Sequence, residues 1–192
     1  MVSRETLISF FFPGREEEIH RYAQFLGSVG IERGLIGPRE ADRIWERHIF
    51  NSLPVISLIA QGSSLIDIGS GAGLPGIPIA LARPDIQVTL IEPLARRVDF
   101  LQEAVADLDI SLLHSRAQDC AVTADYVTAR AVASVEKLKA MSWHLLKAGG
   151  SLLAIKGENA AQEISTLKGA RLHEIKMEGL PIGRVISLRK TG

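Results

Sequence analysis

The residues best suited to chemistry lie in LIDIGSGAGLPGIPIA, residues 65–80. An apolar run leads to Asp67, and four glycines follow: Gly69, Gly71, Gly73 and Gly76. Glycine permits positive φ and lets a ligand approach the backbone closely. Glu92 ends the next apolar run, 19 residues after Gly73, where a carboxylate can accept hydrogen bonds from both hydroxyls of a ribose. The pattern predicts a site for a nucleoside-containing cofactor.

The spacing of the glycines narrows the class of cofactor. The dinucleotide fingerprint G-x-G-x-x-G needs a third glycine where this chain has Leu74. The phosphate-binding pattern G-x-x-x-x-G-K-[ST] is absent from the chain. A nicotinamide-dependent oxidoreductase is therefore disfavoured, although it stays open as an alternative.

These residues need a sheet to position them, and from residue 64 onward short apolar strands alternate with helices. We predict strands at 64–69, 87–93, 110–115, 124–130, 151–157, 173–178 and 184–190. Helices are predicted at 77–84, 94–107, 134–147 and 159–168. The alternation indicates a mainly parallel α/β sheet covered on both faces, and the connection between the last two strands favours an antiparallel pair. Open sheets of this kind bind ligands at the carboxyl ends of their strands.

The first 60 residues have a different, helical pattern. Ile19, Tyr22 and Leu26 recur at helical spacing within a helix predicted at 15–29, and Trp45, Ile49 and Leu53 do so within one at 39–53. We therefore predict an amino-terminal helical cap, residues 1–60, followed by a Rossmann-like domain, residues 61–192.

Length and composition exclude several classes of protein. The chain has 192 residues, the size of one domain, and no uninterrupted apolar run of the roughly 18 residues that a membrane span requires. One cysteine, Cys120, permits no internal disulfide and fits a reducing cytoplasm. With that cysteine and five scattered histidines, we find no spacing typical of a metal site.

The formal net charge is zero, which by itself disfavours binding to nucleic acid. The charges are unevenly distributed, however, because residues 51–119 carry 4 basic and 8 acidic side chains, whereas residues 120–192 carry 11 basic and 6 acidic ones. An RNA partner is therefore compatible with the chain. The net charge of zero predicts modest affinity for naked RNA and recognition of a structured particle by its shape.

The motif D-x-G-x-G-x-G at residues 67–73 resembles motif I of the class I S-adenosylmethionine-dependent methyltransferases. A closer resemblance rests on DIGSGAGLPGIPIA, RRVDFLQE, SRAQD, ARAVAS and the amino-terminal WERHIFNSL. Together these segments resemble the 16S rRNA 7-methylguanosine methyltransferase G family, also called glucose-inhibited division protein B. The resemblance covers about residues 20–190.

The resemblance implies a seven-stranded sheet in the order 3-2-1-4-5-7-6 and methyl transfer from S-adenosylmethionine. The acceptor would be N7 of a guanine in the 530 loop of 16S rRNA, within the 30S subunit or an assembly intermediate. A methyltransferase of another acceptor and a non-catalytic cofactor-binding protein are the remaining alternatives.

The resemblance also implies roles for individual residues. The cofactor-binding positions are Gly69, Gly71, Gly73, Leu74, Glu92, Ala117, Gln118 and Arg130. Arg130, which follows the fourth strand, is also the candidate catalytic residue. Arg47, His48 and Lys156 are candidate contacts to the substrate RNA. Gln118 and Asn51 stand where the family usually has Glu and Asp.

The chemistry of the acceptor agrees with an N7 target. Guanine N7 carries a lone pair and no proton, so its attack on a methyl group needs no general base. Methylation of an exocyclic amino group often uses an N/D-P-P-Y/F loop after the fourth strand, where this chain has ARAVAS. Methylation at carbon 5 of a pyrimidine needs a nucleophilic cysteine, and we interpret Cys120 as structural because it lies after the third strand.

Overall fold

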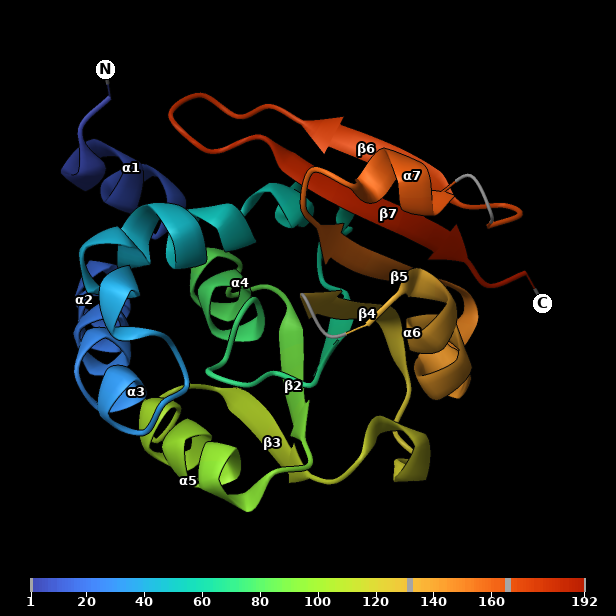
Figure 1. The fold of residues 1–192 in the computed structure, drawn as a ribbon, viewed down its shortest axis with the longest axis horizontal. Coiled ribbons are helices and arrows are strands. Elements are labelled where there is room, and N and C mark those ends of the chain that lie inside the picture. The colour runs from blue at the N-terminus through green and yellow to red at the C-terminus, as the bar shows by residue number, and fades with distance from the viewer. Residues whose placement is uncertain (1, 131–132, 165–166, 192) are drawn as a thin grey trace.

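A seven-stranded sheet forms the centre of the protein (Figure 1). The computed structural model describes residues 2–130, 133–164 and 167–191. The strands are β1 (Ser64–Ile68), β2 (Gln87–Glu92), β3 (Ile110–His114), β4 (Ala124–Arg130), β5 (Leu146–Lys156), β6 (Arg171–Ile175) and β7 (Gly183–Arg189). Their order is β3-β2-β1-β4-β5-β7-β6, and only β7 runs antiparallel to its neighbours. The predicted strand order and the antiparallel final pair are confirmed.

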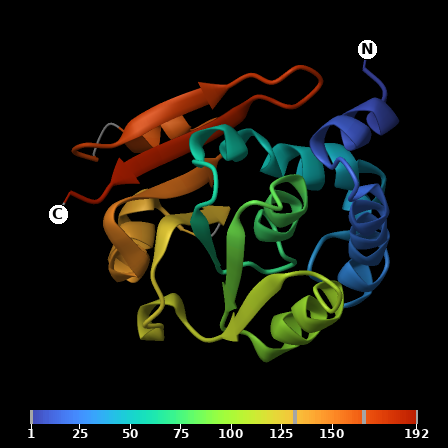
Figure 2. The ribbon, with the colours of Figure 1, turned by 180° about the vertical axis from the view of Figure 1, so that it is seen from behind.

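Alternation along each strand divides the core into two clusters on opposite faces of the sheet. In β1, Leu65 belongs to one cluster, whereas Ile66 and Ile68 belong to the other. The first cluster includes side chains of α4 (Gly76–Ala82) and α5 (Ala95–Ala104), and the second those of α6 (Val135–Ser142) and α7 (Ala160–Ile164). The reverse view in Figure 2 shows the same layers from behind. Parity thereby assigns strand residues to one face or the other, except at the register irregularity between Ala124 and Tyr126.

The amino-terminal cap packs on the α4–α5 face and shares its hydrophobic core. Its helices are α1 (Arg4–Phe11), α2 (Glu16–Gly27) and α3 (Val29–Glu32). Phe25 stacks on Phe100 of α5 with ring centroids 4.7 Å apart, and the Tyr22 hydroxyl donates to the Ala72 carbonyl at 2.8 Å. Within the described residues, no helix is long and apolar enough to cross a membrane.

The continuous helix predicted at 39–53 is wrong. The chain instead forms successive short turns: 3₁₀ turns η1 (Pro38–Arg43), η3 (Phe50–Ser52) and η4 (Pro54–Leu58), with one π-helical turn, η2 (Ile44–Ile49), after η1. The predicted apolar positions Ile49 and Leu53 are buried nevertheless. One tertiary hydrogen bond accompanies the change in winding, because the His48 carbonyl accepts from Arg130 of β4 as well as from the nearby Ser52 hydroxyl.

Several other predicted bounds shift by a few residues. The helix expected at 15–29 divides at Ser28 into α2 and α3, and α5 ends at Ala104 rather than at 107. The helix expected at 134–147 ends at Ser142, and β5 begins at Leu146 instead of 151. The two segments on either side of Gly149 and Gly150 thus form one longer strand, with a register irregularity opposite Ala124.

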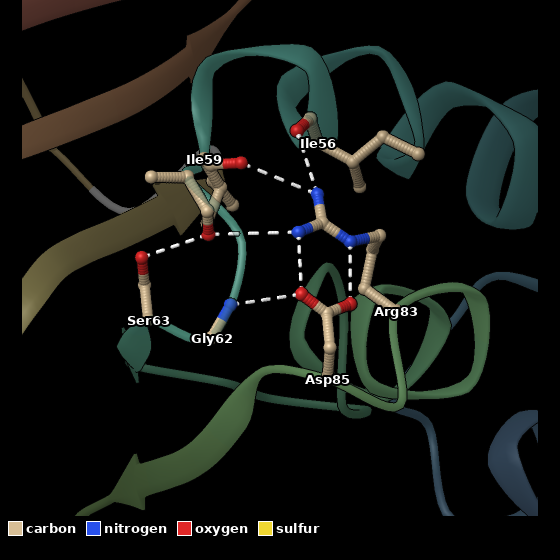
Figure 3. A network of polar contacts seen from close by, with 7 residues as sticks. Ile56, Ile59, Gly62, Ser63, Arg83 and Asp85 are labelled. Atoms are coloured by element: carbon tan, nitrogen blue, oxygen red, sulfur yellow. Dashed lines mark hydrogen bonds and ion pairs between the residues drawn. The ribbon is translucent and has the colours of Figure 1, made fainter.

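A polar clamp, formed by Arg83 and Asp85, joins the end of the cap to the sheet (Figure 3). Arg83 binds both carboxylate oxygens of Asp85 at 2.7 Å and donates to the carbonyls of Ile56 and Ile59. Asp85 also accepts from the Gly62 backbone N–H at 3.0 Å. The clamp holds η4 against the turn between α4 and β2, which fixes where the cap begins to cover the sheet.

Candidate active site

Three charged side chains meet at the carboxyl ends of three adjacent strands. Asp67 lies near the end of β1, Glu92 ends β2 and Arg130 ends β4, and β1 pairs with both other strands. All three lie on the cap-covered face of the sheet. Along their strands, Asp67 shares a face with Leu65, Glu92 with Leu90, and Arg130 with Tyr126. The sheet thus brings together two acids and one base that are far apart in sequence.

The glycine loop after β1 is held by the carboxylate of Asp67. Asp67 Oδ2 accepts from the Gly76 backbone N–H at 3.0 Å, and a Cβ at Gly76 would collide with Leu90 and with Asp67 itself. Gly71 has a φ of 60° and points its N–H toward Glu92. Gly71 needs a positive φ and Gly76 needs space for a close neighbour, and only glycine meets either requirement without strain.

Glu92 is fully buried but well supplied with hydrogen-bond donors. Its Oε2 accepts from the Gly71 N–H at 2.8 Å and its Oε1 from the Leu94 N–H at 3.0 Å. Arg97 lies 3.8 Å away and supplies a nearby positive charge. A carboxylate accepts more than one bond per oxygen, so Glu92 retains capacity to bind the hydroxyls of a ribose.

Asp67 is fully buried, and its Oδ1 has no hydrogen-bond partner among the residues that the structure describes. Burial raises the pKa of this carboxyl group to about 7, although the Gly76 N–H and the charge of Arg130 act in the opposite direction. A buried oxygen without a partner is costly to the folded protein. It is therefore a candidate acceptor for a donor or cation on a ligand.

Arg130 extends from the sheet to the cap. Its Nη1 lies 3.3 Å from the His48 carbonyl and 3.4 Å from that of Arg47, and its Nη2 lies 3.2 Å from His48 Nδ1. Burial lowers the pKa of Arg130, whereas Tyr22 and Asp67 oppose that shift. The group nevertheless remains a cation near neutral pH, because an arginine pKa starts above about 12.

Glu92 and Arg130 border an open cleft of about 600 Å³, whereas Asp67 is not among the described residues that line it. The glycine loop, the end of β2 and the cap all contribute to its lining: Leu35, Ile36, His48, Gly69, Ser70, Gly71, Ala72, Leu74, Glu92, Pro93, Leu94, Arg97 and Arg130. Leu94 is 45% exposed, although it is a large apolar side chain. The cleft therefore combines an apolar surface with a buried carboxylate and a cation, a combination suited to a nucleoside.

Most of the cofactor-binding residues predicted from the sequence lie at this cleft. Gly69, Gly71, Leu74, Glu92 and Arg130 line it. Gly73, with a φ of 91°, instead packs against Ile77 in the same loop. Ala117 and Gln118 lie in a 3₁₀ turn, η5 (Ala117–Asp119), after β3; neither is among the described residues that line the cleft.

The three predicted RNA contacts lie in different surroundings. Arg47 is exposed and binds Glu40 at 2.8 Å, whereas the neighbouring His48 lines the cleft. Lys156 has the opposite strand parity from Leu153 and Ile155, so it faces α7 and binds Glu163 at 3.0 Å and the Ala133 carbonyl at 2.6 Å. Arg130 and Lys156 are therefore not brought together.

Sequence reasoning missed several residues of the cleft. Leu35 and Ile36 come from the cap, in a segment with glycines at positions 30, 34 and 37 that lies between the two predicted helices. Leu94 and Arg97 follow Glu92 within five residues. That position, directly after the acidic end of β2, was a usable signal because residues there must adjoin the carboxyl edge of the sheet.

Comparisons with known proteins agree on the family. The model of a family described as rRNA small subunit methyltransferase G matches residues 15–180. A ribosomal RNA small subunit methyltransferase G of Mycolicibacterium gilvum is 52% identical over 169 residues, which cover 82% of this chain and 74% of that protein. One of Mycobacterium marinum is 49% identical over 179 residues, covering 90% of this chain and 76% of that protein.

Solved structures agree on the fold. A putative S-adenosylmethionine-dependent methyltransferase of Methanococcus maripaludis superposes with a TM-score of 0.58 at 16% identity, covering 88% of this chain and 92% of that chain. A ribosomal protein L11 methylase of Lactobacillus delbrueckii gives a TM-score of 0.55 at 18% identity, covering 73% and 77% of the two chains. At these identities the likeness establishes the architecture alone.

Proposed function

Because the chain belongs to the rRNA small subunit methyltransferase G family, we propose that it methylates N7 of a guanine in the 530 loop of 16S rRNA. The enzyme is an S-adenosylmethionine-dependent rRNA methyltransferase, which decides against the nicotinamide-dependent alternative. Methylation at N7, the 530 loop as the target and an assembled or assembling 30S subunit as the substrate are parts of the proposal.

The observation that supports the site is that Glu92 and Arg130 line one cleft, with Asp67 buried on the strand between theirs. The groups at and near the cleft fit S-adenosylmethionine. Glu92 has capacity for the ribose hydroxyls, Leu94 offers an apolar surface for adenine, and Asp67 Oδ1 is a buried acceptor for the methionine ammonium group.

The residues of the site promote methyl transfer mainly by positioning the reactants and by their charge. S-adenosylmethionine supplies a methyl group that its sulfonium has already activated. Two buried carboxylates, Asp67 and Glu92, favour a cationic ligand at the cleft. Holding the two reacting centres in line can contribute about 7–11 kcal/mol to the lowering of the barrier.

Arg130 is proposed as the catalytic residue because it borders the cleft from the strand beside the glycine loop. A donor on N7 itself would compete with the methyl group for the lone pair. Arg130 would therefore orient the guanine through O6, or by stacking its planar guanidinium on the base. No proton has to be removed from N7, so the site needs no general base.

The RNA would approach over the cap and the carboxyl edge of the sheet. Arg47 is the exposed member of the predicted RNA contacts, with 49% of its side chain accessible. Lys156 and His48 were also predicted as RNA contacts, but their side chains are only 13% and 15% exposed, so the proposal for RNA contact rests on Arg47. The proposed substrate is a 30S subunit or an assembly intermediate, and the proposed location is the cytoplasm.

Mapping N7-methylguanine in 16S rRNA tests the proposal. Cells that lack this protein should lose one N7-methylguanine in the 530 loop and regain it on expression of the wild-type chain. Arg130→Ala should fail to restore it, whereas Arg21→Ala, which changes an exposed arginine of α2, should restore it fully. Unchanged methylation in the deficient cells would refute the N7 assignment, and restoration by Arg130→Ala would refute the role of Arg130.

A further inference from the structure

His48 lies between two charged groups at the border of the cap and the sheet. On one side its Nδ1 lies 3.2 Å from Arg130 Nη2. On the other side its Nε2 lies 3.2 Å from Glu40 Oε2, close enough for an ion pair but poorly directed for a hydrogen bond. The ring is only 15% exposed. It is therefore packed as part of the site rather than displayed to solvent.

The contact with Arg130 determines the protonation state of the ring. A guanidinium has only donors, so Nδ1 must act as the acceptor and carry no proton. The single proton of the neutral ring then resides on Nε2, which faces the Glu40 carboxylate. This tautomer satisfies Arg130 and places the N–H of the ring beside a negative charge.

The backbone around His48 supports the same arrangement. The π-helical turn η2 ends at Ile49, and the carbonyls of Arg47 and His48 both accept from Arg130 Nη1. One segment of the cap thus supplies two carbonyls and a ring nitrogen to a single guanidinium. π-helical turns are frequent at functional sites.

We propose that His48 is a positioning residue for methyl transfer, whose neutral ring and backbone hold the Arg130 guanidinium in its place at the cleft. This inference rests on the proposed function of Arg130. It assigns to His48 a role directed at the enzyme's own arginine, whereas the adjacent Arg47, exposed and paired with Glu40, is the group that faces outward to RNA.

The charges around the ring give the proposal a pH signature. The groups that face His48 are Arg130 from β4, Glu40 from η1 and Arg47 from its own turn. Burial and the charge of Arg130 lower the pKa of His48, and Glu40 only partly opposes them. Protonation of Nδ1 would remove the acceptor and place a second cation beside Arg130. Turnover should therefore fall on the acid side, below the ordinary histidine value of about 6.5.

Three substitutions at one position test the acceptor directly on the full-length enzyme with 30S subunits. Asparagine places its amide oxygen near the position of Nδ1, whereas glutamine reaches toward Nε2 and alanine offers no acceptor. We expect His48→Ala and His48→Gln to lower kcat about 10–100-fold, because misplacing a catalytic group by about 1 Å has effects of this size. The KM for 30S subunits should change little. His48→Asn should restore most of kcat and remove the acid limb of its pH profile.

A matched control separates this effect from a general loss of histidine. His144 contacts only the Cys120 carbonyl among its recorded hydrogen bonds, and His144→Asn should keep the wild-type kcat and acid limb. Thermal melting and titration with S-adenosylhomocysteine should show that each variant is folded. A raised KM with unchanged kcat in His48→Ala would make His48 an RNA contact and overturn the proposal. Equal loss in His48→Asn and His48→Ala would also overturn it.

A spectroscopic measurement tests the contact without relying on turnover. The pKa of His48, followed by NMR titration of its ring, should rise in Arg130→Met because the neighbouring cation is removed. An unchanged pKa would show that the two groups do not interact. If wild-type enzyme methylates no N7, or Arg130→Met remains fully active, the proposed function fails while the NMR coupling between His48 and Arg130 is still measurable.

Discussion

Two arginines join the cap to the sheet, and they do so under opposite electrostatic conditions. Arg83 donates to the carbonyls of Ile56 and Ile59 and also binds both oxygens of Asp85, which raises its pKa (Figure 3). Arg130 likewise donates to cap carbonyls, yet in the described residues it has no hydrogen-bonded carboxylate, and burial lowers its pKa. Arg83 is neutralised within its contact, whereas Arg130 has no such direct carboxylate partner among the described residues and keeps its charge beside the cleft.

The comparison explains why similar contacts serve different purposes. A bidentate arginine–carboxylate pair fixes geometry and satisfies its own charge. A cation held by neutral acceptors alone remains able to interact with an incoming negative or electron-rich group. We therefore expect Arg83 to determine stability and Arg130 to determine turnover.

Substitution of Arg130 should give the largest effect. Arg130→Met keeps much of the side-chain volume but removes the positioned cation, and kcat should fall by at least about 100-fold. Thermal stability should change little, because removal of a buried charge offsets the lost hydrogen bonds. Methyl incorporation into 30S subunits and thermal melting provide the two measurements. A fully active Arg130→Met would remove the distinction between the two arginines.

Substitution of Arg83 should have the converse result. Arg83→Met leaves Asp85 and two cap carbonyls without their donor, and we expect a loss of about 2 kcal/mol in the free energy of unfolding. That figure allows for partial solvent screening of the pair. Urea unfolding measures the loss, and kcat at a temperature where the variant is folded should equal that of the wild type.

The clamp should also persist in acid. Arg83 holds the pKa of Asp85 far below its ordinary value. The pair therefore contributes stability that is fully present above the unfolded pKa and is lost only as pH falls through the low folded value. Urea midpoints of wild type and Arg83→Met should differ at pH 7 and pH 5 by nearly the same amount. Convergence already at pH 5 would contradict the low pKa.

Substitution of Asp67, which lies on the strand next to that of Arg130, should have a smaller effect, on cofactor affinity. Asp67→Asn can keep the contact with the Gly76 N–H but loses the charge, so affinity for S-adenosylmethionine should fall about tenfold. Because burial raises the pKa of Asp67 to about 7, the wild-type affinity should weaken as pH falls below that value, whereas the variant should show no such dependence. Calorimetric titration between pH 5.5 and 8.5, values chosen to span about 7, measures both.

The stability contribution of Asp67 has the opposite sign from that of Asp85. A carboxyl group whose folded pKa is raised binds protons more tightly in the folded state, so its contribution falls as pH rises through the interval between 3.8 and about 7. Asp67→Asn should remove this fall. Wild-type and variant urea midpoints compared across the interval provide the check, and parallel curves would exclude the raised pKa.

Arg47 should give the smallest effect. It lies beside the carbonyl that holds Arg130, but its side chain is exposed, so Arg47→Ala should raise the KM for 30S subunits only a few-fold, with a weaker dependence on salt. The kcat should stay close to wild type. A fall in kcat without a change in KM would mean that Arg47 acts on Arg130 rather than on RNA.

Much of the sheet followed from local pattern. The approximate strand positions, the glycine loop and Glu92 were identified from apolar runs and their terminating residues, because strand parity and glycine conformation act over a few residues, whereas the role of Arg130 came from the family resemblance. Strand parity, which our prediction for Lys156 did not consider, also places that side chain. Lys156 and Ile155 are adjacent in β5 and point to opposite faces, so Lys156 faces α7 rather than Arg130.

The cap was predicted less well because its winding depends on distant partners. The stripe of Trp45, Ile49 and Leu53 correctly indicated a helical apolar face, yet the 39–53 segment divides into short turns whose carbonyls bind a side chain 82 positions later in the chain. Helical periodicity reports which side is buried and not which acceptors a remote arginine will require.

The sequence by itself determined the individual strands, the glycine loop and the positions of Asp67 and Glu92 at or near the ends of β1 and β2, since each depends on contacts within one strand–loop–helix unit. The tertiary structure alone decided that Arg130 is held by His48, that Leu35 and Ile36 reach the cleft, and that one buried oxygen of Asp67 has no partner within the described part of the chain. Those features arise where the cap packs on the sheet, and burial there sets both hydrogen-bond geometry and pKa.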